Sequence, residues 1–317
     1  MPISGSAAAA QDVGSRQSIE DAWWTGPLFA ASPEPMARGH WLVEPYIYDS
    51  IESARYDRDR GRTSVPREDD YGSLTYIFYG LTDKVTVGLL PLVSFKDPSG
   101  VRSSSNIAVG DLALQAAVSL ADFGDAGWLP AISLVGSETL PTGRYERLHT
   151  RTSDGMGAGS YTTTISVFSQ YYFWMPNGRL LRTRLDVSHS WSKDAHITGS
   201  SVYDTPEGFR GRAKRGASDI FDLSFEYSIT REWVAAIDLL RETGHGTLVI
   251  GRYPEPDGTG RAGFRTESGP YHSAALVPAV EYCWSADAGV IVGAKFSVGG
   301  SNTTAALIPI VGINLSF

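Results

Sequence analysis

Apolar and polar residues alternate with a period of two in segment after segment of this chain. Successive side chains of a β-strand point to opposite faces, so this pattern predicts strands with one apolar and one polar face. Twelve such segments cover residues 40–49, 71–81, 84–95, 108–120, 128–140, 160–174, 179–192, 218–229, 232–243, 271–284, 288–298 and 304–317. No stretch approaches the roughly 20 uninterrupted apolar residues that a membrane-spanning helix requires. The chain is therefore expected to be all-β.

The connections between these segments alternate between short and long. The short ones are residues 82–83, 121–127, 175–178, 230–231 and 285–287. The long ones are residues 50–70, 96–107, 141–159, 193–217 and 244–270, with a shorter one at 299–302. Short turns on one side and long loops on the other are typical of transmembrane barrels. Residues 38–317 are predicted to form a single 12-stranded antiparallel up-and-down transmembrane β-barrel with both ends in the periplasm.

A soluble β-sandwich is the alternative fold, because its strands also alternate with a period of two. The mean hydropathy of −0.14 and the hydrophobic content of 42% would suit a soluble protein. However, only alternate residues of a barrel strand meet lipid, so a mild composition is also expected of a barrel. The apolar faces within residues 85–95, 221–229 and 290–298 are continuous and uncharged, which favours the membrane barrel. The net charge of −8 argues against a nucleic-acid partner.

The opposite faces of the strands carry charged and polar side chains, which are expected to line the lumen. A buried charge without a partner is costly, so these residues must pair with one another or meet water. An interior that only stabilises the barrel and a selective solute path are both open interpretations. The predicted lumen residues are Lys84, Asp111, Gln115, Gln170, Arg182, Arg184, Asp186, Asp222, Glu226, Asp238, Glu242, Glu281 and Lys295.

The chain begins with a tail that resembles the end of a secretory signal. Residues 1–10 are rich in small side chains and end in an Ala-x-Ala sequence before Gln11, but no basic region or long apolar core precedes it. We expect a residual signal-peptide tail with a truncated or misassigned start. A small-residue tail without ordered structure is the alternative.

Residues 11–37 form a periplasmic or plug segment in this prediction. Trp23, Trp24, Leu28 and Phe29 are too apolar to remain exposed at low cost. A lumen of twelve strands has room for one short segment, so these residues are expected to block the periplasmic mouth. Packing on the outside of the barrel base is the alternative.

The sequence contains no recognisable catalytic or metal-binding pattern. The six histidines lack metal-ligand spacing, and no nucleophile or phosphate-binding motif is present. The lone Cys283 excludes an intrachain disulfide and a cysteine-based metal cluster. We expect no cofactor, no metal and no enzymatic activity, and a barrel enzyme is the least favoured interpretation.

Several short motifs resemble one known family. They are Gly110-Asp111-Leu112, then Leu140-Pro141-Thr142-Gly143, the glycine-rich residues 155–159, and an alternating final segment that ends on Phe317. Together they resemble the outer-membrane barrel family named for the meta-cleavage pathway of phenol degradation. The resemblance spans residues 71–317 and implies a twelve-stranded barrel for uptake of small hydrophobic or aromatic compounds. Residues 21–29 depart from the family pattern.

Two functions are therefore weighed. The first is an outer-membrane channel or transporter for passive passage of small hydrophobic or aromatic compounds. The second is a structural or adhesive barrel that acts through its external loops. The charged residues 50–70 favour contacts with lipopolysaccharide. Further expected partners are outer-membrane lipid, the small solute, and the barrel-insertion machinery, for which Phe317 would be the membrane-insertion signal.

Overall fold

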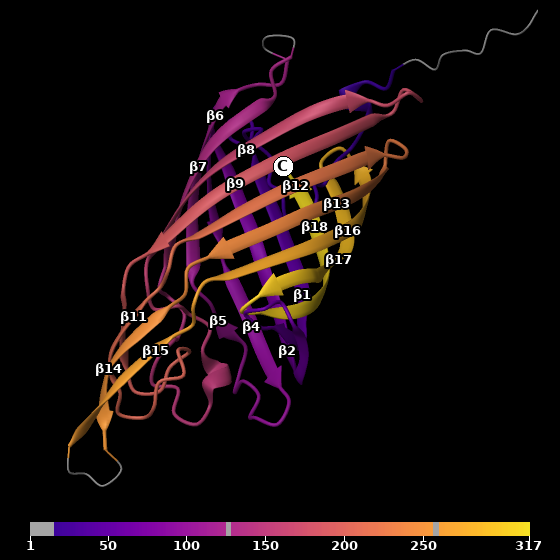
Figure 1. The fold of residues 1–317 in the computed structure, drawn as a ribbon. Coiled ribbons are helices and arrows are strands. Elements are labelled where there is room, and N and C mark those ends of the chain that lie inside the picture. The colour runs from indigo at the N-terminus through magenta and orange to yellow at the C-terminus, as the bar shows by residue number, and fades with distance from the viewer. Residues whose placement is uncertain (1–15, 125–127, 256–259) are drawn as a thin grey trace, which may run out of the picture.

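The main feature of the fold is one antiparallel sheet that closes on itself. The computed structural model describes residues 16–124, 128–255 and 260–317. The sheet closes because β1 (Trp41–Tyr56) pairs with both β2 (Arg62–Thr82) and β18 (Thr303–Ser316). The result is a tall barrel of tilted strands (Figure 1). The other barrel strands are β3 (Val85–Leu90), β4 (Leu92–Pro98), β5 (Ala108–Val109), β6 (Leu112–Ala121), β7 (Ala131–Leu140), β8 (Thr162–Trp174), β9 (Leu180–Ser192), β12 (Ser218–Ser228), β13 (Trp233–Gly244), β16 (Tyr271–Ser285) and β17 (Ala288–Ser301).

Two of the strands that cross the barrel wall are interrupted, so that each is divided into two shorter strands. Only Pro91 separates β3 from β4, and both strands pair with β2. Proline has no N–H to donate to a neighbouring strand, which explains the break. Gly110 and Asp111 separate β5 from β6, which pair with β4 and β3 in turn. When β3 with β4 and β5 with β6 are each counted as one interrupted strand, the 14 strands of the sheet form a barrel of twelve strands. The predicted twelve-stranded barrel is confirmed.

The outer surface of the barrel is apolar, as the alternation predicts. Val280, Val292 and Val311 are register neighbours on three adjacent strands, and each is at least 44% exposed. Alternate residues of the same strands face the interior, where Val277 and Ile291 are buried. The barrel therefore carries an apolar belt that suits a lipid environment.

Within the described residues, no helix is both long and apolar enough to span a membrane.

The prediction of a long loop over residues 50–70 is wrong. β1 and β2 continue past residue 50 as a paired hairpin that turns only at residues 57–61, with a bulge near Glu52. A strand that projects into water needs no apolar face, so alternation of polarity does not reveal it. The connection predicted at 299–302 is likewise shorter, because β17 and β18 are separated only by Asn302 in a left-handed conformation (φ 48°).

The loops predicted at residues 193–217 and 244–270 contain a second sheet. Its strands are β10 (Ala195–Thr198), β11 (Arg210–Lys214), β14 (Leu248–Pro254) and β15 (Arg261–Glu267), in the order β10-β11-β14-β15. Each continues one barrel strand after a break of two or three residues. Figure 1 shows β11, β14 and β15 at the lower end of the barrel, opposite the end that carries the short turns.

Two further predictions concern Lys84 and the N-terminal tail. Lys84 does not start a strand: it lies exposed in the turn before β3, so its assignment to the lumen is wrong. The signal-like tail and the cleavage site before Gln11 lie outside the described residues.

A matched pair of substitutions on β6 tests which face meets lipid. Ala116 faces outward and is exposed, whereas its neighbour Ala117 lines an internal cavity. We expect Ala116→Arg to destabilise the barrel by about 2 to 4 kcal/mol and Ala117→Arg to cost clearly less, because only the first places a charge in the bilayer. Reversible unfolding titrations in lipid vesicles measure both. Equal losses would contradict the assignment of faces.

Candidate functional site

The N-terminal residues 24–36, here called the inner strap, run through the lumen. The chain enters at the end with the short turns, where the Trp23 N–H donates to the carbonyl of Arg231 (2.9 Å). It reaches the middle of the barrel at Ala30 and Ala31 and then returns to the same end. There the Gly39 N–H donates to the carbonyl of Gly80 (2.8 Å), just before β1 begins.

Carboxylates on the inward faces of the strands hold the first limb of the strap. The backbone N–H of Thr25 donates to Glu281 (2.7 Å), that of Ala30 to Asp238 (3.1 Å), and that of Ala31 to Asp186 (2.7 Å). The strap forms no strand ladder, so its buried N–H groups need partners elsewhere. A carboxyl group offers two oxygen atoms that can accept hydrogen bonds, which suits these acids to the role.

Two arginines complete this charged wall. Arg182 donates from Nε to Glu226 (2.7 Å), and its guanidinium lies 4.4 Å from the centre of the Trp24 ring. Arg184 donates to the side chain of Gln170 and to the carbonyl of Ala30, both at 2.8 Å. These side chains are at most 6% exposed, so each charge must be paired inside the barrel. The arginines thereby link the wall to the strap.

Polar side chains on other strands hold the second limb. The Met36 N–H donates to Thr86 Oγ1 (2.9 Å), and Gln170 Nε2 donates to the Glu34 carboxylate (2.8 Å). The Ser133 hydroxyl donates to the carbonyl of Pro33. Ser133 and Thr25 were not among the predicted site residues. An inward-facing serine or threonine is too common in sequence to be singled out without knowing where the strap lies.

The predicted lumen residues fall into three groups. Gln170, Arg182, Arg184, Asp186, Asp222, Glu226, Asp238 and Glu281 are buried on the wall formed by β8, β9, β12, β13 and β16. Gln115 lines the inner cavity described below, while Asp111 accepts from the backbone of Gly143 and Ala158 at the mouth with the long loops. Glu242 accepts from the Tyr271 hydroxyl (2.6 Å), and Lys295 lies 5.4 Å from the Phe29 ring.

The four predicted plug residues occupy different environments. Leu28 is 8% exposed and packs with Val277, Ile291 and Ile310 inside the barrel. Trp24 lies against Arg182, whereas Trp23 stays at the barrel end, 4.7 Å from the Arg231 guanidinium. Phe29 is 38% exposed at the turn of the strap. Trp23 thus contacts the turn between β12 and β13.

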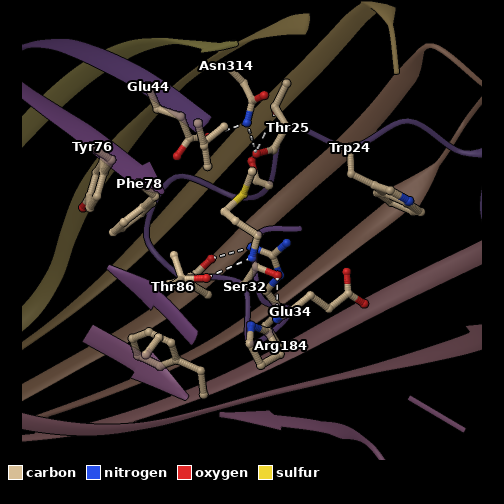
Figure 2. Close-up of a pocket in the computed structure, with 18 of the residues that line it drawn as sticks. Trp24, Thr25, Ser32, Glu34, Glu44, Tyr76, Phe78, Thr86, Arg184 and Asn314 are labelled. Atoms are coloured by element: carbon tan, nitrogen blue, oxygen red, sulfur yellow. Dashed lines mark hydrogen bonds between the residues drawn. The ribbon is translucent and has the colours of Figure 1, made fainter. Parts of the chain in front are cut away.

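An inner cavity of about 330 Å³ lies between the strap and the wall opposite the acids. Figure 2 shows Glu44, Tyr76, Phe78 and Thr86 on one side of it and strap residues on the other. Tyr46 and Tyr76 contact edge to face with ring centres 5.7 Å apart, and Phe168 also lines the space. The strap therefore leaves one aromatic-rich side of the lumen unfilled.

An outer cavity of about 530 Å³ lies nearer the long loops. Its lining is mainly apolar, with Lys96 and Arg215 as cations and Asp70 and Asp111 as acids. Tyr203 reaches it from a loop and donates its hydroxyl to the carbonyl of Ala158 (2.5 Å). Burial raises the pKa of the Tyr203 phenol, so it remains a neutral donor at ordinary pH. The two opposite pairs of charges leave the cavity without a large net charge.

Among the described residues, no group of three or more His, Cys, Asp or Glu side chains has an arrangement that could hold a metal ion.

Comparisons with known proteins support the fold. No protein-family model matches the chain, and no curated protein matches its sequence. The COG4313 outer membrane channel from Pseudomonas putida F1 is similar in structure, with a TM-score of 0.68 at 15% identity, covering 92% of this chain and 100% of the channel.

Weaker similarities add no further support. The toluene transporter TbuX of Ralstonia pickettii has a TM-score of 0.40 at 7% identity, covering 89% of this chain and 90% of the transporter. The β domain of the Bordetella autotransporter BrkA has a TM-score of 0.45 at 12% identity, covering 89% of this chain and 100% of that domain. The closed barrel and its apolar belt make this chain an outer-membrane β-barrel with the fold of a bacterial outer-membrane channel.

The pair formed by Arg182 and Glu226 offers a test of the charged wall. We expect Arg182→Met to destabilise the barrel by about 3 to 5 kcal/mol, because it leaves the buried Glu226 carboxylate without its main partner. Arg231→Met, at an exposed turn, should cost less than about 1 kcal/mol. Unfolding titrations in lipid compare the two variants. A loss at Arg182 no larger than that at Arg231 would show that the pair is not essential to the wall.

Proposed function

We propose that this outer-membrane barrel is a channel for passive passage of small hydrophobic or aromatic compounds. The single observation that carries the proposal is the alignment of the two cavities. Leu74 lines the outer cavity and Tyr76 the inner one, two residues apart on β2. On β6, Ala113 lines the outer cavity and Gln115, two residues later, lines the inner one. At roughly 3.3 Å per residue, about 7 Å of wall separates the two spaces.

The chemistry of this wall supports an apolar solute. Leu90, Leu92 and Met156 contribute to the outer cavity. Aromatic rings form part of the inner one, together with polar side chains and the charged Glu44 and Arg184. An apolar molecule gains by leaving water for such surfaces, while scattered hydroxyl and amide groups accommodate one polar substituent. The resemblance to the phenol meta-cleavage family also favours aromatic compounds. Lipopolysaccharide and the insertion machinery, acting through Phe317, are further proposed partners.

The inner strap is proposed to be the gate. It borders the inner cavity along residues 24–36, so a solute must pass it to leave at the periplasmic end. Its backbone is held by a few carboxylates rather than by a strand ladder, so it can be displaced without opening the barrel.

A structural or adhesive barrel is the second candidate. The sheet formed by β10, β11, β14 and β15 favours it. This sheet lies beyond the barrel, and its strands are not part of the wall that the two cavities share. Conductance in planar bilayers separates the two candidates.

The path is tested by placing a large side chain on the stretch of wall between the two cavities. We expect Ala113→Trp, on the inward face of β6, to reduce liposome uptake of toluene or phenol about tenfold, because the ring fills about 7 Å of open wall. Ala116→Trp, on the lipid face of the same strand, should leave uptake unchanged. Normal uptake in the folded Ala113→Trp variant would contradict this path.

The gate is tested by weakening the acids that hold the strap. We expect the double substitution Asp186→Leu and Asp238→Leu to raise single-channel open probability several-fold, because the N–H groups of Ala30 and Ala31 lose their acceptors. Glu242→Leu is the matched control, since Glu242 bonds to Tyr271 and not to the strap. Unchanged gating in the double variant, with the barrel intact, would overturn the role of the strap.

A further inference from the structure

The second sheet carries an unusual concentration of positive charge for a chain with a net charge of −8. The outward-facing residues of β10, β11, β14 and β15 include six cations and one histidine, here called the basic face: His196, Arg210, Arg212, Lys214, Arg252, Arg261 and Arg265. Arg212 pairs with Asp194 (3.3 Å) and Arg265 with Glu267 (3.6 Å). Within the described parts of the chain, no acid forms an ion pair with the other four cations.

The arrangement of these cations indicates a ligand. Arg210 and Arg252 lie directly opposite each other on β11 and β14. Like charges in this position destabilise a sheet unless an anion lies between them. A shallow hollow of about 390 Å³ runs over the same strands, and His196, Arg210, Arg252 and Arg261 are among the residues that line it. The space is therefore bordered by guanidinium groups, which bind phosphate oxygens in pairs.

The orientation of the sheet places the basic face on the outside of the barrel wall. The order β10-β11-β14-β15 repeats the order of the barrel strands β9, β12, β13 and β16 that it extends. Its other face buries Ile197, Phe209 and Val249 against Tyr145 and Tyr203. Tyr203 also lines the outer cavity, so that face looks toward the barrel axis. The arginines on the opposite side therefore point away from the lumen.

The basic face lies just above the part of the wall that meets lipid. Trp191, near the end of β9, is 45% exposed, as expected for an aromatic residue at the membrane interface. Thr198, which lies opposite Arg210, follows seven residues later, which corresponds to about 18 to 23 Å for a tilted strand. Arginine side chains at this height lie at the level of the phosphorylated core sugars of lipopolysaccharide.

We propose that the basic face binds the phosphate groups of lipopolysaccharide in the outer leaflet. Charge complementarity selects a polyanion, and the position directly above the apolar belt selects one that is anchored in the membrane. The site is separate from the solute path, and it differs from the contact expected for residues 50–70, whose charges are of both signs.

The test is binding of purified rough lipopolysaccharide to the full-length folded protein in detergent. We expect Arg210→Gln together with Arg252→Gln to weaken binding about tenfold or more, and to reduce its salt dependence, because two cations that face the phosphates are lost. Arg38→Gln with Lys84→Gln removes two exposed cations at the opposite, periplasmic end of the barrel and should change the affinity less than about twofold. Resistance of the folded barrel to detergent at room temperature confirms that each variant is intact.

Two further probes identify the ligand. Enzymatically dephosphorylated lipopolysaccharide should bind the unaltered protein as weakly as the double variant binds the phosphorylated form. Equal binding of the two lipopolysaccharides, or equal losses in the two double variants, would overturn the proposal. Soluble polyphosphate that binds as tightly as lipopolysaccharide would show that the face takes a free polyanion instead of the membrane glycolipid.

Discussion

The internal architecture depends on the need to pair backbone N–H groups inside a barrel. The strands satisfy their own N–H groups through the closed ladder, but the inner strap has no ladder to join. Glu281, Asp238 and Asp186 supply acceptors instead, at 2.7 to 3.1 Å from the strap nitrogens. The same acids would be too costly to bury alone, so the strap and the arginines stabilise the wall as much as the wall holds the strap.

This requirement divides the lumen into two unlike halves. The wall from β8 to β16 is occupied by charges and the first limb of the strap. The wall from β1 to β7 carries aromatic and small polar side chains besides charged ones such as Glu44 and Asp111, and both cavities border it. Twelve strands enclose more space than side chains alone fill, and one strap takes up only part of the surplus. An off-centre path along the less charged wall follows from these two facts.

The sequence predicts the barrel well because lipid imposes a strict alternation on each strand. Twelve segments, short turns and the inward position of Arg182 and Glu226 all follow from that period. Alternation is not required where strands leave the membrane, so the extended β1–β2 hairpin and the sheet of β10, β11, β14 and β15 were missed. Lys84 was misplaced because a turn residue at a strand end fits the period as well as a strand residue does.

The path of the inner strap could not be predicted from the sequence. The apolar character of Trp24 and Leu28 indicates that they must be buried, but it does not say against which strand. Pairing of a backbone N–H with a distant carboxylate, such as Ala31 with Asp186, leaves no local pattern in either segment. Likewise, the alignment of the two cavities depends on which side of the lumen the strap leaves empty.

Hydrogen exchange of the strap amides in the unaltered protein tests the central claim most directly. We expect the amides of Thr25, Ala30 and Ala31 to exchange far more slowly than those of an unstructured peptide, although no strand pairs with them. Exchange of these three amides at the rate of a free peptide, with the barrel strands still protected, would contradict it. In that case the strap would not be docked on the acids, and the division of the lumen would not hold.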